Sequence, residues 1–198
     1  MDYIIKDTSI VNEGKILQGD VLIKKGRIEQ VLHSGNVKYA VTEIDGRGKH
    51  LLPGAIDDQV HFREPGLTHK ANIYTESRAA VAGGVTSFME MPNTSPPVFT
   101  QDLLEDKYAI GAQTSLANYS FFMGTSNDNI EEVLKTNKKK NEVCGVKIFM
   151  GSSTGNLLVD NPLVLDKIFA NTELLIATHC EDEQIIKHNL AELKRIKP

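Results

Sequence analysis

LLPGAIDDQVHFREPG, residues 51–66, is the stretch in which an apolar strand runs directly into side chains that can bind metals and carboxylates. Because side chains alternate between the two faces of a strand, the pattern predicts that one face carries Asp57, Gln59, His61 and Arg63. Burying such a row without partners is costly, so we interpret it as the lining of a site. Pro65-Gly66 predicts a turn that leaves His61 and Arg63 at the C-terminal end of the strand, where parallel sheets bind ligands.

Apolar strands alternate with helical stretches throughout residues 51–198. After the first strand come VTSFMEM, NYSFFM, GVKIFM and ELLIATHC, each followed by an amphipathic segment. Strands recur about every 30 residues, the length of a βα unit. This predicts an α/β fold, an incomplete (β/α)8 TIM barrel of about five βα units, since a full barrel takes about 250 residues. We therefore expect the front portion of a longer protein. A self-contained five-stranded doubly wound sheet is the alternative.

Residues 1–50 have a different pattern, in which short strands are separated by polar turns. Lys25-Gly26 predicts a tight turn between two of these strands. The region carries no catalytic constellation, and we expect a small β-rich module, part of a β-sandwich, ahead of the barrel domain at 51–198.

The composition restricts the partners and the compartment. A formal net charge of -4 over 198 residues argues against a nucleic-acid or membrane-surface partner. No apolar run approaches the roughly 20 residues of a membrane span, and the N-terminus does not read as a signal peptide. We expect a cytoplasmic protein. Cys144 and Cys180 lack CxxC spacing and are predicted to be buried in strands rather than disulfide-bonded.

Three residues at strand ends could form a metal site: His61, Lys147 and His179. Histidine is the commonest metal ligand near neutral pH, and a catalytic metal takes ligands from separate strands while keeping a position open for water. Each histidine alone could instead be a hydrogen-bonded core or surface residue. Lys147 stands between two apolar strand residues, so burial would depress its pKa, and a salt bridge to an acidic partner is the alternative to a metal role. Asn93, in the segment MPNT, could bind a substrate or cap its loop.

Four motifs occur in order along the chain: PGAIDDQVHFREPG, AAVAGGVTSFMEMPNTSPP, GVKIFMGSSTGN and ATHCEDE. With them the chain resembles the dihydroorotases of the amidohydrolase superfamily, over essentially all of its length, and looks like their N-terminal portion. The resemblance implies the reversible cyclisation of N-carbamoyl-aspartate to dihydroorotate in pyrimidine biosynthesis. It also implies zinc at the mouth of a (β/α)8 barrel.

The resemblance implies roles for individual residues. His61 looks like the second histidine of the family's HxH metal pair, and His179 matches the ligand on the fifth strand. Lys147 matches a lysine that many relatives carry as a carbamate bridging two metals. Arg63 and Asn93 look like the groups that hold the substrate carboxylate, a task for which a guanidinium fork is suited.

One position departs from the family pattern. Gln59 stands where the first histidine of HxH is usual, and an amide oxygen is a poorer zinc ligand than imidazole. The resemblance therefore implies one or two zinc ions, with Gln59 as a doubtful ligand. The general acid and base, an aspartate, is expected beyond Pro198. No catalytic residue is then expected within this chain, and the chain alone should be inactive.

Two other functions stay open. Another cyclic amidohydrolase, a dihydropyrimidinase or allantoinase, would not need the carboxylate clamp of Arg63 and Asn93. A catalytically silent dihydroorotase-like subunit is suggested by Gln59. For an active enzyme the expected partner is the small-molecule substrate, N-carbamoyl-aspartate or dihydroorotate, and a homo-oligomer is compatible with the sequence.

Overall fold

A computed structural model describes residues 2–33, 40–151 and 156–197 of the chain. They fall into two units, Met1–Gly54 and Ala55–Pro198, which are considered separately. In the motif GSSTGN, residues 152–155 lie outside the described residues. No helix in the described part of the chain has the length and apolar character needed to cross a bilayer.

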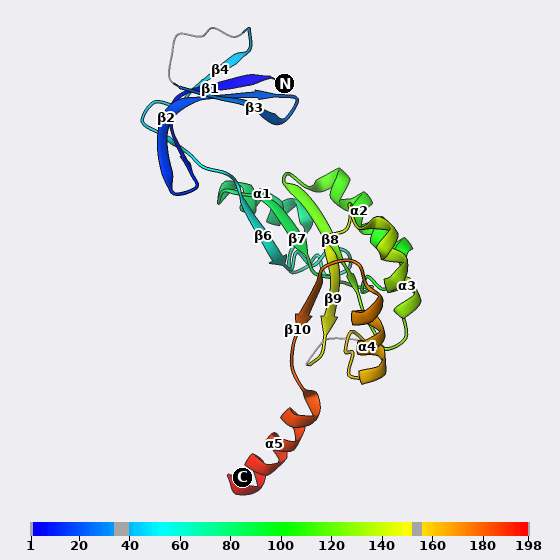
Figure 1. Ribbon diagram of the computed structural model, residues 1–198. Coiled ribbons are helices and arrows are strands. Elements are labelled where there is room, and N and C mark those ends of the chain that lie inside the picture. The colour runs from blue at the N-terminus through cyan, green and yellow to red at the C-terminus, as the bar shows by residue number, and fades with distance from the viewer. Residues whose placement is uncertain (1, 34–39, 152–155, 198) are drawn as a thin grey trace. The chain divides into compact units, whose positions relative to one another are not determined.

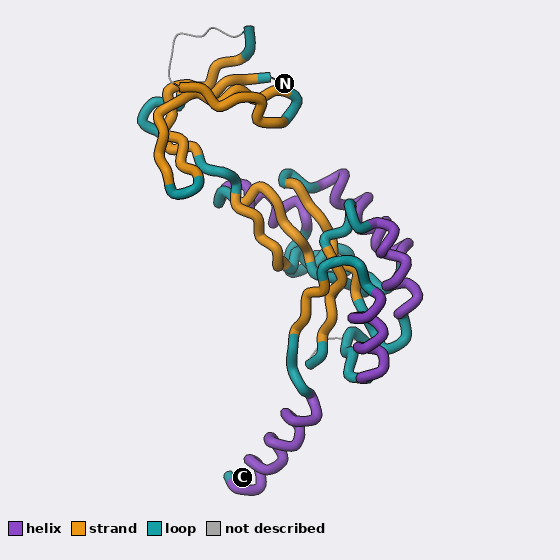
Figure 2. The backbone as a smooth tube through the Cα atoms, viewed as in Figure 1, coloured by secondary structure: helices purple, strands orange, loops and turns teal. Residues whose placement is uncertain are grey.

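The first unit is built on strand β1, Tyr3–Asn12, which pairs antiparallel with β2, Lys15–Lys24. On the far side of β2 lies β3, Arg27–His33, while β4, Thr42–Asp45, and β5, His50–Leu51, run parallel to β1. Lys25 and Gly26 have φ angles of 51° and 73°. Left-handed residues at both positions of a two-residue loop match the twist of a β-hairpin. The unit is all strand and turn where described, as Figure 2 shows.

The second unit contains a parallel sheet of five strands in the order β10-β9-β8-β7-β6. The strands are β6 Ala55–Val60, β7 Val85–Glu90, β8 Asn118–Gly124, β9 Gly145–Phe149 and β10 Ile176–His179 (Figure 1). Spatial order follows chain order, as in a barrel, whereas a doubly wound sheet reverses at a switch point. The sheet is curled, and the predicted fold class, an incomplete barrel of five βα units, is confirmed.

Helices follow the strands of this sheet, and α2, α3 and α4 lie along one of its faces (Figure 1). The helical segments are α1 Ile73–Ala82, α2 Gln101–Thr114, α3 Ile130–Lys135, the 3-10 turn η1 Thr136–Lys139, α4 Pro162–Asn171 and α5 Glu183–Ile196. Asn72 begins α1 with a capping box. After the helix, Gly84 takes a φ of 90°, a left-handed conformation that glycine adopts without strain.

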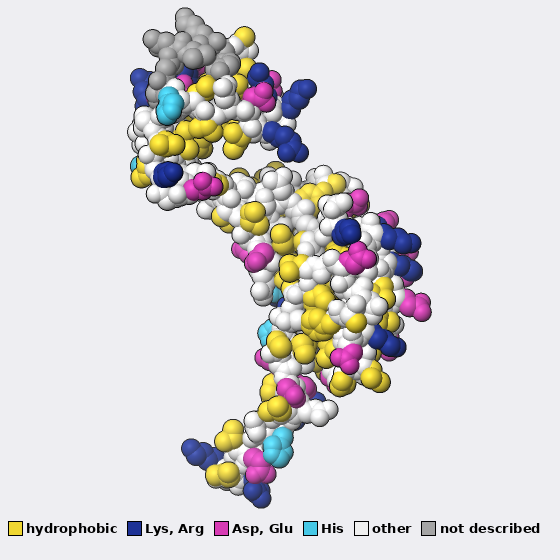
Figure 3. Space-filling view, viewed as in Figure 1, with side chains coloured by type: hydrophobic (Ala, Val, Ile, Leu, Met, Phe, Trp, Pro, Cys, Tyr) yellow, Lys and Arg dark blue, Asp and Glu magenta, His cyan; other side chains and the backbone are white. Residues whose placement is uncertain are grey.

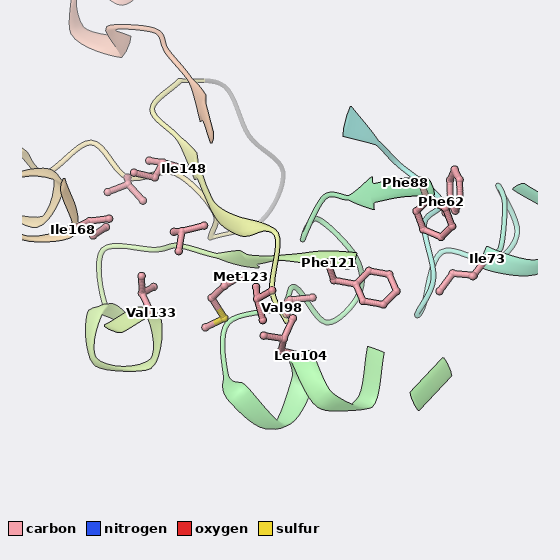
Figure 4. Packing of buried hydrophobic residues seen from close by; sticks show 13 residues of the cluster. Phe62, Ile73, Phe88, Val98, Leu104, Phe121, Met123, Val133, Ile148 and Ile168 are labelled. Carbon is pink, nitrogen blue, oxygen red and sulfur yellow. The ribbon is translucent and has the colours of Figure 1, made fainter. Parts of the chain in front are cut away.

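The hydrophobic core lies between the helices and the sheet. The rings of Phe62 and Phe88 pack in a tilted arrangement with centroids 4.5 Å apart. Figure 4 shows Leu104 of α2 directed toward Val98 and Met123. The helix-covered face of the sheet is therefore largely apolar.

Leu104 gives a direct test of this packing, because its side chain is only 1% exposed. Leu104→Ala is expected to lower the free energy of unfolding by about 2–5 kcal/mol through lost burial and the cavity left behind. Leu116, which is 56% exposed, provides the control. Leu116→Ala should change the free energy of unfolding by less than about 0.5 kcal/mol. Urea unfolding measures both, and equal effects would contradict the assigned core.

The last helix, α5, is not part of this core. None of its residues is buried, and its apolar side chains are open to solvent, with exposures of 58% for Ile185 and 67% for Ile196 (Figure 3). The cap at Asp182, whose carboxylate accepts backbone N–H groups of Gln184 and Ile185, begins the helix. Cys180, predicted to be buried, is exposed, because β10 ends one residue earlier at His179.

Candidate active site

The strand that opens the site, β6, ends at Val60, so His61 and Arg63 lie in the loop that follows. Asp57 pairs with Phe88, and Val60 pairs with Glu90. Between these two pairs the chain advances three residues along β6 but only two along β7. The extra residue is a bulge, a feature that re-aims side chains next to active sites. The predicted alternation is therefore wrong at one position. Asp57 shares the face of Val60, not that of Gln59.

The two loops that carry the most specific motifs pack directly on each other. The backbone N–H of Ser95 donates to the carbonyl of Pro65 over 3.1 Å. Gly66 has a φ of 82°, and a Cβ there would lie 1.8 Å from the Ser95 carbonyl oxygen. Only glycine allows this approach, which joins the segment VHFREPG to the segment MPNTSPP.

His61 and Asn93 come together across these loops, with His61 Nδ1 2.8 Å from Asn93 Oδ1. When the amide oxygen accepts, Nδ1 carries the proton and Nε2 keeps its lone pair. Histidines that bind metals are commonly held in this way by a hydrogen bond at the other ring nitrogen. Burial lowers the pKa of His61, the hydrogen bond to Asn93 opposes this shift, and the charges of Arg63 and Lys147 add to it. The neutral, ligand-competent ring is favoured.

Lys147, in the middle of β9, is only 3% exposed. Its Nζ lies 4.9 Å from the centroid of the Phe149 ring. The alternative of a salt bridge is not found: no carboxylate among the described residues lies within ion-pair distance of this amine. Burial lowers the pKa of Lys147, since desolvation disfavours the ammonium. A larger fraction of Lys147 is therefore in the neutral amine form than at a surface lysine.

His179 lies on the strand next to Lys147. Lys147 pairs with Ala177, and Phe149 pairs with His179. The side chains of Lys147 and His179 therefore project from the same face of this parallel pair. The rings of Phe149 and His179 stack with centroids 6.3 Å apart. His179 is exposed, and its Nε2 lies 3.2 Å from Glu181 Oε1. In this arrangement the carboxylate competes for the nitrogen that a metal would need.

Gln59 is exposed, and its backbone N–H donates to Asp57 Oδ1 over 3.2 Å. The described residues contain no group of three His, Cys, Asp or Glu side chains arranged to hold a metal ion. Two histidines and Lys147 therefore make up the candidate ligand set. It needs Lys147 to supply an oxygen ligand, which the amine can do only after modification.

Two buried charged residues next to the site were missed by the sequence analysis. Glu90 ends β7, Lys107 lies in α2, and both are 0% exposed. Lys107 Nζ lies 3.0 Å from Glu90 Oε2. Glu90 stands between two methionines in an apolar strand, the same signal that singled out Lys147. Nothing in the helical pattern distinguishes Lys107 from a solvent-facing lysine.

Comparisons with known proteins show that the chain is similar to proteins named L-hydantoinase, dihydroorotase and allantoinase. The L-hydantoinase (dihydropyrimidinase) of Arthrobacter aurescens superposes with a TM-score of 0.89 at 27% identity, over 100% of this chain and 44% of that one. The dihydroorotase of Methanosarcina acetivorans is 33% identical over 186 residues, 93% of this chain and 39% of that protein. An allantoinase of Deinococcus radiodurans is 31% identical over 192 residues, 94% of this chain and 42% of that protein.

The fold and the relatives are those of the cyclic amidohydrolases. The family model described as dihydro-orotase-like matches residues 48–191. The chain belongs to this dihydro-orotase-like family. It spans about two fifths of the length of the curated relatives that it matches.

Proposed function

We propose that the protein to which this chain belongs is a cytoplasmic dihydroorotase, which interconverts N-carbamoyl-aspartate and dihydroorotate. The observation that carries the proposal is the contact between His61 and Asn93, with Arg63 two residues further along the same loop and close enough for its charge to act on His61. The guanidinium forms no ion pair with any described residue. The Arg63 guanidinium is therefore free to bind the carboxylate of a substrate next to the candidate metal ligands. Hydantoin and allantoin have no carboxylate.

We propose that His61, His179 and a modified Lys147 together would hold zinc. His61 is fixed through Nδ1 by Asn93, and His179 projects from the Lys147 side of the sheet. Addition of the neutral Lys147 amine to CO2, with loss of one proton, gives an anionic carbamate. This would remove the unpaired buried ammonium and supply two oxygen ligands. When bound, zinc polarises a carbonyl oxygen and lowers the pKa of a water ligand.

The chain's own residues bind and orient the substrate. Arg63 would hold the carboxylate by two parallel hydrogen bonds, and the Asn93 NH2 would donate a third. Fixed orientation removes part of the entropic barrier. Asn93 Oδ1 would keep the proton on His61 Nδ1 throughout. We propose that the aspartate acting as general acid and base lies outside this chain, which alone would then be inactive.

Turnover by the full-length protein tests the proposal. With zinc and bicarbonate present, we expect ring opening of dihydroorotate with kcat/KM at least about 100-fold above that for hydantoin or dihydrouracil, the value of roughly 3 kcal/mol of carboxylate binding. Absorbance of the ring amide follows each reaction. Faster turnover of hydantoin would identify a hydantoinase-type enzyme instead.

A silent subunit is the second candidate, because the first HxH position is an exposed glutamine. It predicts a full-length protein that binds no zinc and opens no ring. Metal stoichiometry by elemental analysis separates the two: one or two zinc ions per chain support the enzyme, and none supports the silent subunit.

A further inference from the structure

We propose that the buried pair Glu90–Lys107 is a positioning device for the carboxylate clamp, with the Glu90 carboxylate holding the backbone of Arg63. The inference rests on the proposed function and deepens it. It assigns no contact with the substrate to either residue.

The two carboxylate oxygens of Glu90 contact different parts of the chain, the loop at Arg63 and helix α2. Oε1 accepts the backbone N–H of Arg63 at 3.0 Å, while Oε2 lies 3.0 Å from Lys107 Nζ. Lys107 Nζ also donates to the carbonyl of Met91 over 3.0 Å, two residues before Asn93. Helix α2 is thereby tied to both loops that carry the clamp.

The backbone at Arg63 needs such a partner. Its φ is 70°, in the left-handed region that a non-glycine residue enters only at a cost. The Arg63 carbonyl accepts from the N–H of Leu67 over 3.0 Å, so both polar backbone groups are fixed in this conformation. The direction in which the guanidinium leaves the loop then depends on the acceptor at Glu90.

Stability alone does not account for the charges. Both side chains are 0% exposed, and replacing a buried ion pair by apolar residues is often neutral or stabilising, whereas removing one partner is strongly destabilising. Burial raises the pKa of Glu90 and lowers that of Lys107, with each charge opposing the shift of the other. A charged pair is kept here for the geometry that it imposes.

Two double variants of the full-length protein isolate the acceptor. Glu90→Gln/Lys107→Met removes both charges but keeps an oxygen facing Arg63, whereas Glu90→Leu/Lys107→Met also removes that oxygen. We expect the Gln variant to stay within about threefold of wild-type KM for dihydroorotate. The Leu variant should raise KM tenfold or more with kcat changed less than about threefold, since ground-state binding is lost. The surface pair between α2 and η1, changed as Glu105→Gln/Lys139→Met, is the control.

Backbone hydrogen exchange of the segment 61–66 supplies a readout that does not need activity. Exchange at the Arg63 amide should be at least tenfold faster in the Leu variant than in the Gln variant. If the two variants match in both exchange and KM, the positioning role is excluded. If wild-type protein opens no ring while exchange still separates the variants, the proposed function fails and the backbone contact stands. Should both doubles fail to fold, the Arg63 amide of the wild-type protein must exchange at least about tenfold more slowly than the same amide in an unfolded chain for the inference to survive.

Discussion

Replacing Lys147 by alanine is expected to lower kcat/KM for dihydroorotate about 1000-fold and to reduce the bound zinc to less than half of the wild-type content. The loss corresponds to about 4 kcal/mol of transition-state stabilisation, the scale of a Lewis-acid contribution. The amine is buried, has no carboxylate partner among the described residues and has a lowered pKa. Its removal should therefore not cost an ion pair, and the variant is expected to fold.

Three measurements test this result. Elemental analysis gives the metal content, steady-state kinetics the activity, and electron density at the Lys147 nitrogen the modification. Short-chain carboxylic acids should restore part of the activity of Lys147→Ala by supplying the lost oxygens. Lys138→Ala, at an exposed lysine, serves as the control. A Lys147→Ala protein with full zinc and full activity would rule out a ligand role.

The fold was predictable because its signals are local and repeated. Strands β7 to β10 are mostly short apolar runs at regular spacing, and Gly84 follows α1 in a left-handed turn as expected. The sequence could not show the bulge between Asp57 and Val60, because the register depends on the neighbouring strand and not on β6 itself. For the same reason the faces assigned to residues 57–63 were partly wrong.

The candidate site was predictable only in part. Lys147 stood out as a cation in an apolar strand, and its burial confirms that reading of the local pattern. The contact between His61 and Asn93 joins residues 32 positions apart, which no local pattern reveals. The role of Lys107 depends on which side of α2 meets the sheet, and that is decided by packing.

Arg63 yields the second large effect. In Arg63→Lys a single ammonium replaces the fork that can form two parallel hydrogen bonds, and we expect KM for dihydroorotate to rise about 10- to 100-fold. Arg63→Gly removes the charge altogether, and kcat/KM should fall by about 100-fold or more, since hydrogen bonds to charged groups are each worth roughly 1.5–3 kcal/mol. Turnover of dihydrouracil, which lacks the carboxylate, should change less than about threefold in either variant. Arg78→Met, at an exposed arginine of α1, is the matched control.

The glycine variant also separates function from folding. At a φ of 70° arginine is strained and glycine is not, so Arg63→Gly should leave the free energy of unfolding unchanged or raise it by up to about 1 kcal/mol. If the strained conformation aims the guanidinium as proposed, activity would then fall while stability holds. Urea unfolding and substrate kinetics on the same preparation of Arg63→Gly measure its stability and its activity. A variant that loses stability in step with activity, or loses dihydrouracil turnover equally, would show that Arg63 supports the loop and does not bind the carboxylate.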